Sequence, residues 1–463
     1  METQSTKRRK SFRISPGQVI PLSFLALILF GTLLLMLPFA AAPGGKHDFV
    51  TALFTATTSV CVTGLVVVDT YSNWSLFGHL VILFLIQIGG LGVITVTYLL
   101  LSGFRKRRFS LSDRILVQNA VGLDTTIGLF AFIRKVVAGT FFVEGIGALL
   151  SCFVLVPEFG LVGGIWRSVF HAISAFCNAG IDIIGPDSMA RYAENPLMLI
   201  TTMMLIVLGG LGFVVWFDLI GDLKTGIRKH FSVKQIFKRA GEHTRLVLLL
   251  NLVLIFGGGL LFFLLEWGNP DTFAKLSPGG QVLGSLFQSV TLRTAGFTVP
   301  PQGNFRDTSL LVSYLLMFIG GSPIGTAGGI KTVTFFLMML NVLSYIQGKD
   351  EIVLFKRKIS EELMRKASAI TGVSFIVCML MTLLLMVFEP VGLRDALFEV
   401  ISALATVGLT RGLTPQLHVT GRLLIVLCMY LGRIGPISMA LFFVKAVPHT
   451  NRISFPEGNY HVG

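Results

Sequence analysis

Eight long apolar segments limit the folds this sequence can adopt more than any other feature does. They lie at residues 18–41, 75–103, 131–157, 196–221, 243–267, 309–345, 367–389 and 418–447. About 20 apolar residues suffice for a helix to cross a bilayer. Only 13% of the residues are charged, about half the share in a soluble domain, which leaves too few polar groups to cover a water-exposed surface. The sequence therefore predicts an all-α polytopic membrane protein.

A shorter stretch ending near a glycine lies between the two long segments of each pair. The four stretches read FTATTSVCVTGL (54–65), FHAISAFCNAGI (170–181), LFQSVTLRTAGF (286–297) and FEVISALATVGL (398–409). Their glycines are 116, 116 and 112 residues apart. Such stretches are too short to span the bilayer, and lie at that depth only where they are buried in protein or line a water-filled cavity. We therefore predict four pseudo-symmetric helix–pore-loop–helix repeats around a central pore, as in potassium channels.

The predicted organisation divides the chain at the basic connecting segments. Repeat 1 is expected at 18–103, repeat 2 at 131–221, repeat 3 at 243–345 and repeat 4 at 367–447, with cytoplasmic terminal segments at 1–17 and 448–463. The segments on one side of the membrane carry 27 Lys and Arg residues and the opposite side carries nine. Cytoplasmic loops carry the excess of basic residues. Both termini are therefore predicted to be cytoplasmic, and the net charge of +14 indicates topology and contact with membrane lipids, with no nucleic acid as partner.

The residues around the four glycines are predicted to form a selectivity filter. Carbonyls can line a pore consecutively only where some residues adopt positive φ, which glycine does at little steric cost. Backbone carbonyls in such a filter replace the water shell of potassium. The predicted ion-binding residues are Val62, Thr63, Gly64, Asn178, Ala179, Gly180, Thr294, Ala295, Gly296, Thr406, Val407 and Gly408. Because each repeat supplies one glycine with dissimilar neighbours, we expect fewer ion sites and looser selectivity than in a symmetric channel.

The apolar segment 309–345 is too long for one helix through the bilayer, and small residues interrupt its middle. Broken helices occur in membranes where they line a cavity. We predict a gate loop at 320–332 below the filter, formed by Gly320, Gly321, Ser322, Pro323, Gly325, Thr326, Gly328, Gly329 and Lys331, with Arg433 as its partner from the last segment. The alternatives are an electrostatic barrier formed by Arg433, a structural kink, a salt bridge from Arg433 to an acid such as Glu144, and a Lys331 side chain that reaches toward water.

Arg293, three residues before Gly296, is unexpected in a cation filter, and we expect it to pair behind the filter with an outer carboxylate such as Glu399. The repeated sequences GGLGV (89–93) and GGLGF (209–213) are interpreted as sites of close packing inside membrane helices. The eight histidines are scattered and no nucleotide-binding glycine loop follows a strand. The sequence therefore predicts that this protein is not an enzyme and that this chain binds no cofactor.

These motifs resemble the membrane subunit of the Trk/Ktr/HKT potassium transporter superfamily over essentially the whole chain. The matching motifs are CVTGL (61–65), FCNAG (176–180), SVTLRTAGF (289–297), SALATVGL (402–409), GGSPIGTAGGIKT (320–332) and LGRIGP (431–436). The chain begins directly with the first repeat, which is typical of the Ktr-type branch. The resemblance implies potassium uptake, often stimulated by sodium, by a homodimer in the cell membrane. It also implies a separate cytoplasmic ring of nucleotide-binding regulatory subunits, which would bind ATP or ADP.

Alternatives to a potassium pore differ in how ions cross or in which ions do. Plant relatives with Ser at the first filter position favour sodium, so Gly64 places this chain with the potassium-selective members that the resemblance implies. Sodium or ammonium permeation remains an alternative within the family. An alternating-access secondary carrier is another class, but such carriers typically contain inverted repeats, whereas these four repeats run in the same direction.

Overall fold

The fold is built almost entirely of helices. The computed structural model describes residues 16–92, 129–185, 188–349 and 351–435. Its α-helices are α1 (Pro16–Leu35), α2 (Phe49–Cys61), α3 (Thr70–Asn73), α4 (Leu76–Leu91), α7 (Leu129–Cys177), α8 (Pro196–Gly210), α9 (Phe213–Lys229), α10 (Val233–Arg239), α11 (Glu242–Leu265), α12 (Pro278–Thr291), α13 (Asp307–Phe318), α14 (Thr332–Ile346), α15 (Glu361–Phe388), α16 (Leu393–Leu404) and α17 (Val419–Ile434). Short 3-10 helices lie at Ala190–Tyr192, Gln302–Asn304 and Thr414–Gln416. The helical membrane fold predicted from the sequence is confirmed.

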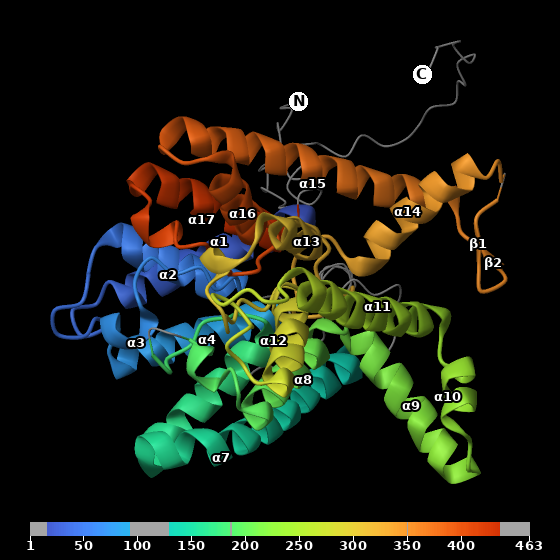
Figure 1. The fold of residues 1–463 in the computed structure, drawn as a ribbon, viewed down its shortest axis with the longest axis horizontal. Coiled ribbons are helices and arrows are strands. Elements are labelled where there is room, and N and C mark those ends of the chain that lie inside the picture. Colours follow the sequence, from blue (N-terminus) through green and yellow to red (C-terminus); the bar gives the residue numbers. More distant parts are fainter. Residues whose placement is uncertain (1–15, 93–128, 186–187, 350, 436–463) are drawn as a thin grey trace, which may run out of the picture.

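Two short strands between α14 and α15 are an exception within the described ranges. β1 (Val353–Leu354) pairs antiparallel with β2 (Arg357–Lys358), and Val353 lies opposite Lys358. Figure 1 shows this hairpin and α10 at the same end of the molecule, far from the loop between α2 and α3. Both elements lie in segments where the sequence gathers lysine and arginine.

The first helix of each repeat is long enough to cross a membrane. Four helices among the described residues combine sufficient length with apolar composition, namely α1, α7, α11 and α15. α7 is two helices joined at Gly160, which has φ 73° and ψ 170°. Its first part belongs to the long apolar segment and its second part ends at Cys177, immediately before the second glycine-containing stretch. The counterparts of this second part are α2, α12 and α16, which we call the short pore helices.

The short pore helices and the helices that follow them pack in a closed cycle. α4 contacts α7, α8 contacts α12, α13 contacts α16 and α17 contacts α2. Each contact joins one segment of the sequence to the next, and the last contact returns from the C-terminal segment to the N-terminal one (Figure 1). This cyclic packing brings the ends of all four short pore helices toward one region.

In repeats 1, 2 and 4, the helix that begins the second long segment ends inside the span predicted at 75–103, 196–221 or 418–447. α4 ends at Leu91, α8 ends at Gly210 and α17 ends at Ile434. Gly92, Gly212 and Gly435 then have φ of 87°, 96° and 90°, a conformation that glycine reaches without a Cβ clash. α8 and α9 bend by 102° at the break. In repeat 3 the break is the longer loop 319–331 between α13 and α14, as predicted for the segment 309–345.

Two buried glutamates connect the first and second helices of repeats 3 and 4. Glu266 accepts hydrogen bonds from Arg306 N at 3.0 Å and from Ser309 Oγ, at the start of α13. Glu389 accepts from His418 N and Gly421 N, both at 3.1 Å, at the start of α17. A carboxylate at a helix N-terminus satisfies free N–H groups and complements the helix dipole. Both contacts therefore stabilise the loops that join these helices.

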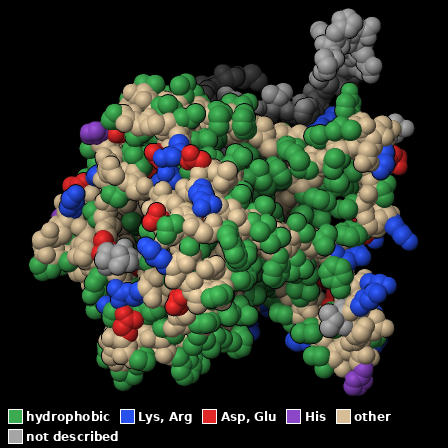
Figure 2. All heavy atoms as spheres, in the orientation of Figure 1, with side chains coloured by type: hydrophobic (Ala, Val, Ile, Leu, Met, Phe, Trp, Pro, Cys, Tyr) green, Lys and Arg blue, Asp and Glu red, His purple; other side chains and the backbone are tan. Residues whose placement is uncertain are grey.

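Much of the outer surface of the helices is hydrophobic. Figure 2 shows hydrophobic side chains across the middle of this face, with most lysines, arginines and acidic residues nearer the two ends. On α11, Val253 and Phe256 are 60% and 59% exposed, and on α15 Ile376 is 65% exposed. Exposed apolar patches of this extent are unfavourable in water, so this surface fits the hydrocarbon region of a membrane. The predicted terminal segments at 1–17 and 448–463, and the ends of repeats 1 and 4 at 93–103 and 436–447, lie outside the described residues except for 16–17.

Candidate functional site

The four predicted filter glycines lie in contact with one another's chain segments. Gly64, Gly180, Gly296 and Gly408 have φ of 102°, 64°, 83° and 92°. A Cβ placed on Gly64 would lie 2.5 Å from Ala179 O, one on Gly180 would lie 2.5 Å from Ala295 O, and one on Gly296 would lie 2.7 Å from Val407 O. One on Gly408 would collide with Thr63 O. Each glycine therefore contacts the carbonyl oxygen of the residue that precedes the filter glycine of the next repeat. The contact of the fourth glycine with repeat 1 closes the ring.

The residue two positions before each glycine also has a left-handed backbone. Val62, Asn178, Thr294 and Thr406 have φ of 54°, 60°, 70° and 52°. Sequence reasoning attributed the unusual backbone to the glycines alone and missed these positions. Asn tolerates this conformation, whereas for β-branched Val and Thr it is a genuine outlier. Such strain costs about 1–3 kcal/mol per residue and persists only where the surrounding structure enforces it.

Helix termination explains why these residues are left-handed. In repeat 1, Thr63 N donates to Thr58 O at 2.9 Å and Val62 N donates to Ser59 O at 3.2 Å. This pair of hydrogen bonds is the Schellman motif, whose left-handed position is usually occupied by glycine. Repeats 2 and 4 form the same pair of bonds around Asn178 and Thr406. In repeat 3 the chain makes a further turn, and Ala295 N donates to Thr291 O instead.

Hydroxyl groups of the short pore helices hold the segments that follow. Thr58 Oγ1 accepts from Gly64 N at 2.9 Å, and Ser402 Oγ accepts from Gly408 N at 3.1 Å. Ser174 Oγ accepts from Ile181 N at 3.1 Å, and Thr291 Oγ1 donates to Phe297 O at 2.6 Å. The first three hydroxyls each lie six residues before their glycine. These bonds occupy backbone groups at or just after the glycines.

The predicted gate loop lies against the ends of the short pore helices. Gly328 N donates to Thr294 Oγ1 at 3.2 Å, and Thr326 Oγ1 donates to Phe176 O at 3.1 Å. Gly328 also lies so close to Thr406 that a Cβ there would collide with its hydroxyl group. The loop therefore contacts the ends of the short pore helices of repeats 2, 3 and 4, next to the left-handed residues.

The break between α8 and α9 provides the other face of this contact. Because α8 ends at Gly210, the carbonyls of its last turn lack helical partners. Gly209 O accepts from Thr326 N at 3.1 Å, and Gly210 O accepts from Ser322 N at 3.0 Å. Phe213 N in turn donates to Ile324 O at 2.9 Å. The two irregular segments thus form hydrogen bonds with each other's free backbone groups. The sequence GGLGF is therefore the site of a helix break as well as of close packing.

Arg433 contacts the loop through a hydrogen bond. Its Nη1 donates to Thr326 O at 2.7 Å, and its Nη2 donates to Gly89 O in the last turn of α4. The alternative salt bridge to Glu144 is wrong: Glu144 instead accepts from Gln87 Nε2 at 3.1 Å. Lys331 does not extend toward water, because its Nζ donates to Ala327 O at 2.6 Å within the loop.

The predicted pairing of Arg293 with Glu399 is also wrong. Glu399 is fully buried and accepts hydrogen bonds from Thr410, at 2.9 Å, and from Thr414. Arg293 instead lines a small cavity of about 10 Å³ together with Asn178 and Asn251. That volume is near the minimum for one water molecule. The error arose because the Glu399 oxygens are used by the outer loop of their own repeat, a contact that spacing does not indicate.

Comparison with known proteins finds similar proteins that match nearly the entire chain. The TrkH family model, described as cation transport protein, matches residues 5–454. The Ktr system potassium uptake protein B of Bacillus subtilis (strain 168) is 36% identical over all of both chains. The potassium/sodium uptake protein NtpJ of Enterococcus hirae is 36% identical over 99% of each chain. The Ktr system potassium uptake protein B of Vibrio alginolyticus is 37% identical over 96% of this chain and 94% of the relative.

A solved structure has the same fold. The potassium transporter TrkH from Vibrio parahaemolyticus superposes with a TM-score of 0.72, over 94% of this chain and 87% of that chain, at 17% identity. At this identity the likeness concerns the fold alone.

Proposed function

Because the chain belongs to the TrkH family of cation transport proteins, we propose that it takes up potassium across the cytoplasmic membrane through the ring around Gly64, Gly180, Gly296 and Gly408. The family resemblance predicted from the sequence motifs is confirmed. Members of this family are cation transporters, and we propose a transport function without enzymatic chemistry. The chain is a multi-pass membrane protein, and both termini are proposed to face the cytoplasm.

The closed ring of glycines and carbonyls is the observation that carries this proposal. Four glycines with positive φ come from four segments. Each packs against the carbonyl oxygen of the residue that precedes the next glycine in the cycle. Potassium-selective filters replace the ion's water shell with backbone carbonyls. The proposed ligands are therefore backbone oxygens of the three residues per repeat that end at these glycines. Flow through such a site is passive, and the membrane potential contributes about 2.3 kcal/mol per charge per 100 mV.

The names of similar proteins bear on the choice of ion. Two of the compared relatives are named potassium uptake proteins, and a third is named a potassium/sodium uptake protein. We propose potassium as the main transported ion and sodium as a stimulating or additional ion. Sodium or ammonium permeation in preference to potassium is the alternative that the transport experiment below decides.

The loop 319–331 is proposed to act as the gate. It contacts the filter-proximal residues Thr294 and Thr406 from below and is held by Arg433. An ion leaving the ring toward α14 meets this loop first. Opening then requires the loop to move aside, which breaks its hydrogen bonds to the break between α8 and α9.

Partner subunits are proposed on the family resemblance together with the exposed basic elements. We propose a homodimer, and a separate cytoplasmic nucleotide-binding ring that binds ATP or ADP. α10 and the β1–β2 hairpin lie at the end of the molecule that carries excess lysine and arginine (Figure 1). Beside the hairpin, Tyr345 is 89% exposed and a groove of about 370 Å³ contains Lys349 and Arg365. These elements are the proposed contact surface for the regulatory subunit.

Ion uptake by filter variants tests the proposal directly. The wild-type chain, Gly64→Ser and Gly296→Ser are compared in a bacterium that lacks potassium uptake, with rubidium, potassium and sodium as transported ions. Gly268→Ser serves as the control, because Gly268 has φ 71° but open space around its Cβ position. Loss of potassium preference with retained sodium flux in the filter variants, and unchanged preference in the control, is expected. Indifference to both filter substitutions would refute the filter.

A further inference from the structure

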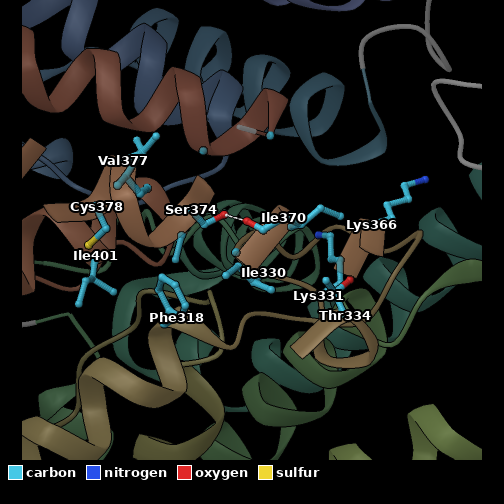
Figure 3. A pocket seen from close by; sticks show the side chains of 15 residues that line it. Phe318, Ile330, Lys331, Thr334, Lys366, Ile370, Ser374, Val377, Cys378 and Ile401 are labelled. Carbon is cyan, nitrogen blue, oxygen red and sulfur yellow. Dashed lines mark hydrogen bonds between the residues drawn. The ribbon is translucent and has the colours of Figure 1, made fainter. Parts of the chain in front are cut away.

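A cavity of about 260 Å³ lies beside the gate loop, between α14, α15, α16 and α17. Figure 3 shows Lys331, Thr334 and Lys366 at one end of this cavity, and Phe318, Val377 and Ile401 toward the other end. Its inner wall contains Gly329 and Ile330 of the loop and Ala405, three residues before Gly408. The cavity therefore connects a basic surface with the underside of the proposed filter.

Within the part of the chain that the structure describes, no acidic side chain pairs with the lysines at the basic end of the cavity. No ion pair among the described residues includes Lys331 or Lys366. Lys331 Nζ donates to the backbone oxygen of Ala327 in the loop, a neutral partner that leaves the net charge of the ammonium group unmatched by these residues. Uncompensated charge at membrane depth is costly. An anionic group at this end would therefore bind favourably.

The rest of the cavity suits a hydrocarbon chain. Apart from Ser374, the side chains beyond the lysines are apolar, and Ser374 Oγ is occupied by its hydrogen bond to Ile370 O at 2.8 Å. One water occupies about 30 Å³ in the liquid, so 260 Å³ accommodates a segment of an acyl chain but not a whole lipid. Neighbouring residues on α15, such as Phe375 and Ile376, are 57% and 65% exposed on the hydrophobic surface. The cavity thus has an anion-binding end and an apolar interior next to the membrane.

We propose that an anionic phospholipid of the cytoplasmic leaflet binds in this cavity and holds the gate loop in its closed position. Its phosphate lies at Lys366 and Lys331, and one acyl chain extends past Ile370 and Val377 toward Ala405. The chain fills the space into which residues 329–330 would otherwise move. The proposed regulation rests on the proposed gate function of the loop. The proposed lipid-binding site does not depend on that function.

Quenching by brominated lipids tests occupancy without measuring transport. A tryptophan is introduced by Val377→Trp, or by Ile370→Trp as a second reporter, in the full-length protein reconstituted into vesicles. The fluorescence is compared with that of the parent protein, which has four tryptophans. Acyl-brominated phosphatidylglycerol should quench the added tryptophan more than acyl-brominated phosphatidylcholine does. Lys366→Ala should weaken this preference about fivefold, as expected for one basic residue at an anionic surface, and Lys224→Ala at an exposed position of α9 should leave it unchanged.

Either of two quenching results overturns the site. Equal quenching by both lipids, insensitive to Lys366→Ala, would mean ordinary contact with the bilayer. No quenching from either reporter would mean that the cavity is closed or filled by protein, such as residues 436–463 or a second copy of the chain.

Rubidium flux into the same vesicles tests the effect on the gate. Lys366→Ala should raise flux in vesicles containing phosphatidylglycerol and leave it unchanged in phosphatidylcholine alone. Altered quenching with unaltered flux in a transporting protein would overturn the regulatory part. Absence of flux from the wild-type chain in every vesicle would instead count against the proposed function, while the quenching result would still decide the site.

Discussion

Arg433 Nη1 donates a hydrogen bond to the backbone oxygen of Thr326 at 2.7 Å, although the two residues are 107 positions apart in the sequence. The same guanidinium group donates to Gly89 O, so one side chain connects α17, the gate loop and α4. Thr326 is also held by bonds to Gly209 O and Phe176 O. The position of the loop therefore depends on direct contacts from repeats 2 and 4, and on repeat 1 through Arg433.

Replacing Arg433 is expected to release the loop. Hydrogen bonds to charged groups contribute about 1.5–3 kcal/mol each, so Arg433→Ala should shift a closed–open equilibrium by about tenfold or more. We expect higher rubidium flux with unchanged preference for potassium over sodium. Arg422→Ala in the same helix is the control, because Arg422 donates to Pro415 O rather than to the loop. Equal flux from wild type and Arg433→Ala, at equal amounts of protein in the membrane, would contradict the role of this contact.

Shortening the loop should have a larger effect than removing its partner. The loop ends are held together by Gly320 N donating to Ile330 O at 2.9 Å and Gly321 N donating to Gly328 O at 3.3 Å. Deletion of residues 323–327 can therefore be bridged without moving α13 or α14. Flux measured in vesicles should rise above that of Arg433→Ala. Thr326→Ser, which keeps the hydroxyl group that donates to Phe176 O, should behave as wild type, and lost flux in a correctly inserted deletion variant would argue against a gate.

Gly408 and Gly412 have nearly equal φ but different surroundings. Substituting each of them therefore distinguishes the effect of backbone strain from the effect of packing in the ring. Gly408 and Gly412 have φ of 92° and 94°, but a Cβ on Gly408 meets Thr63 O and Gly64, whereas one on Gly412 has open space. Both Ala variants bear the strain of a left-handed residue, about 1–2 kcal/mol. Thermal unfolding in detergent should therefore show some destabilisation for both. Only Gly408→Ala should lose potassium preference in uptake assays; equal transport defects in both variants would reject the ring as the discriminating feature.

The loop after the second filter segment should make uptake sensitive to external pH. Burial raises the pKa of Asp182 to about 6, and its carboxyl group accepts from Ile184 N at 3.2 Å and Ser188 Oγ at 2.7 Å. A pH of 7 lies above this pKa, so the group is mostly ionised there. Because the pKa is raised to about 6, the group becomes neutral on mild acidification through that value. Loss of a fixed negative charge beside Gly180 lowers the local cation concentration.

Rubidium uptake by the wild-type chain should therefore fall on mild external acidification. Asp182→Asn should show lower uptake at pH 7 and little further change at pH 5. Asp271→Asn, an exposed aspartate of the outer loop in repeat 3, should keep the wild-type pH profile. An unchanged profile in Asp182→Asn would assign the pH dependence to another group.

The predictions from sequence were most accurate where one short segment contains all the necessary information. The break in the segment 309–345 follows from its length and its glycines, and the structure contains it at 319–331. The helix ends just before Gly92, Gly212 and Gly435 were missed, although GGLG and LGRIG contain similar glycines. Each of these motifs is short and surrounded by apolar residues, so local composition alone also suits a continuous, closely packed helix.

The left-handed residues before the filter glycines were missed for a different reason. Val62 and Thr406 have high preference for strands and low preference for positive φ. Their conformation results from the way the short pore helices end, where two backbone hydrogen bonds close a Schellman motif. No side-chain pattern indicates this, because the hydrogen-bonding groups belong to the backbone.

The sequence by itself determined that this chain is a helical membrane protein, with four glycine-containing segments at a nearly constant spacing. The length of the apolar segments and the spacing of the glycines are properties of the sequence itself, and they can be determined without knowing any long-range contact. Only the tertiary structure decided that Gly408 meets Thr63, that Arg433 holds Thr326 rather than Glu144, and that Arg293 is not paired with Glu399. These are contacts between side chains or backbone groups that compete for several chemically suitable partners. Which partner is in reach depends on how the helices pack, because packing fixes the distances that sequence separation leaves open.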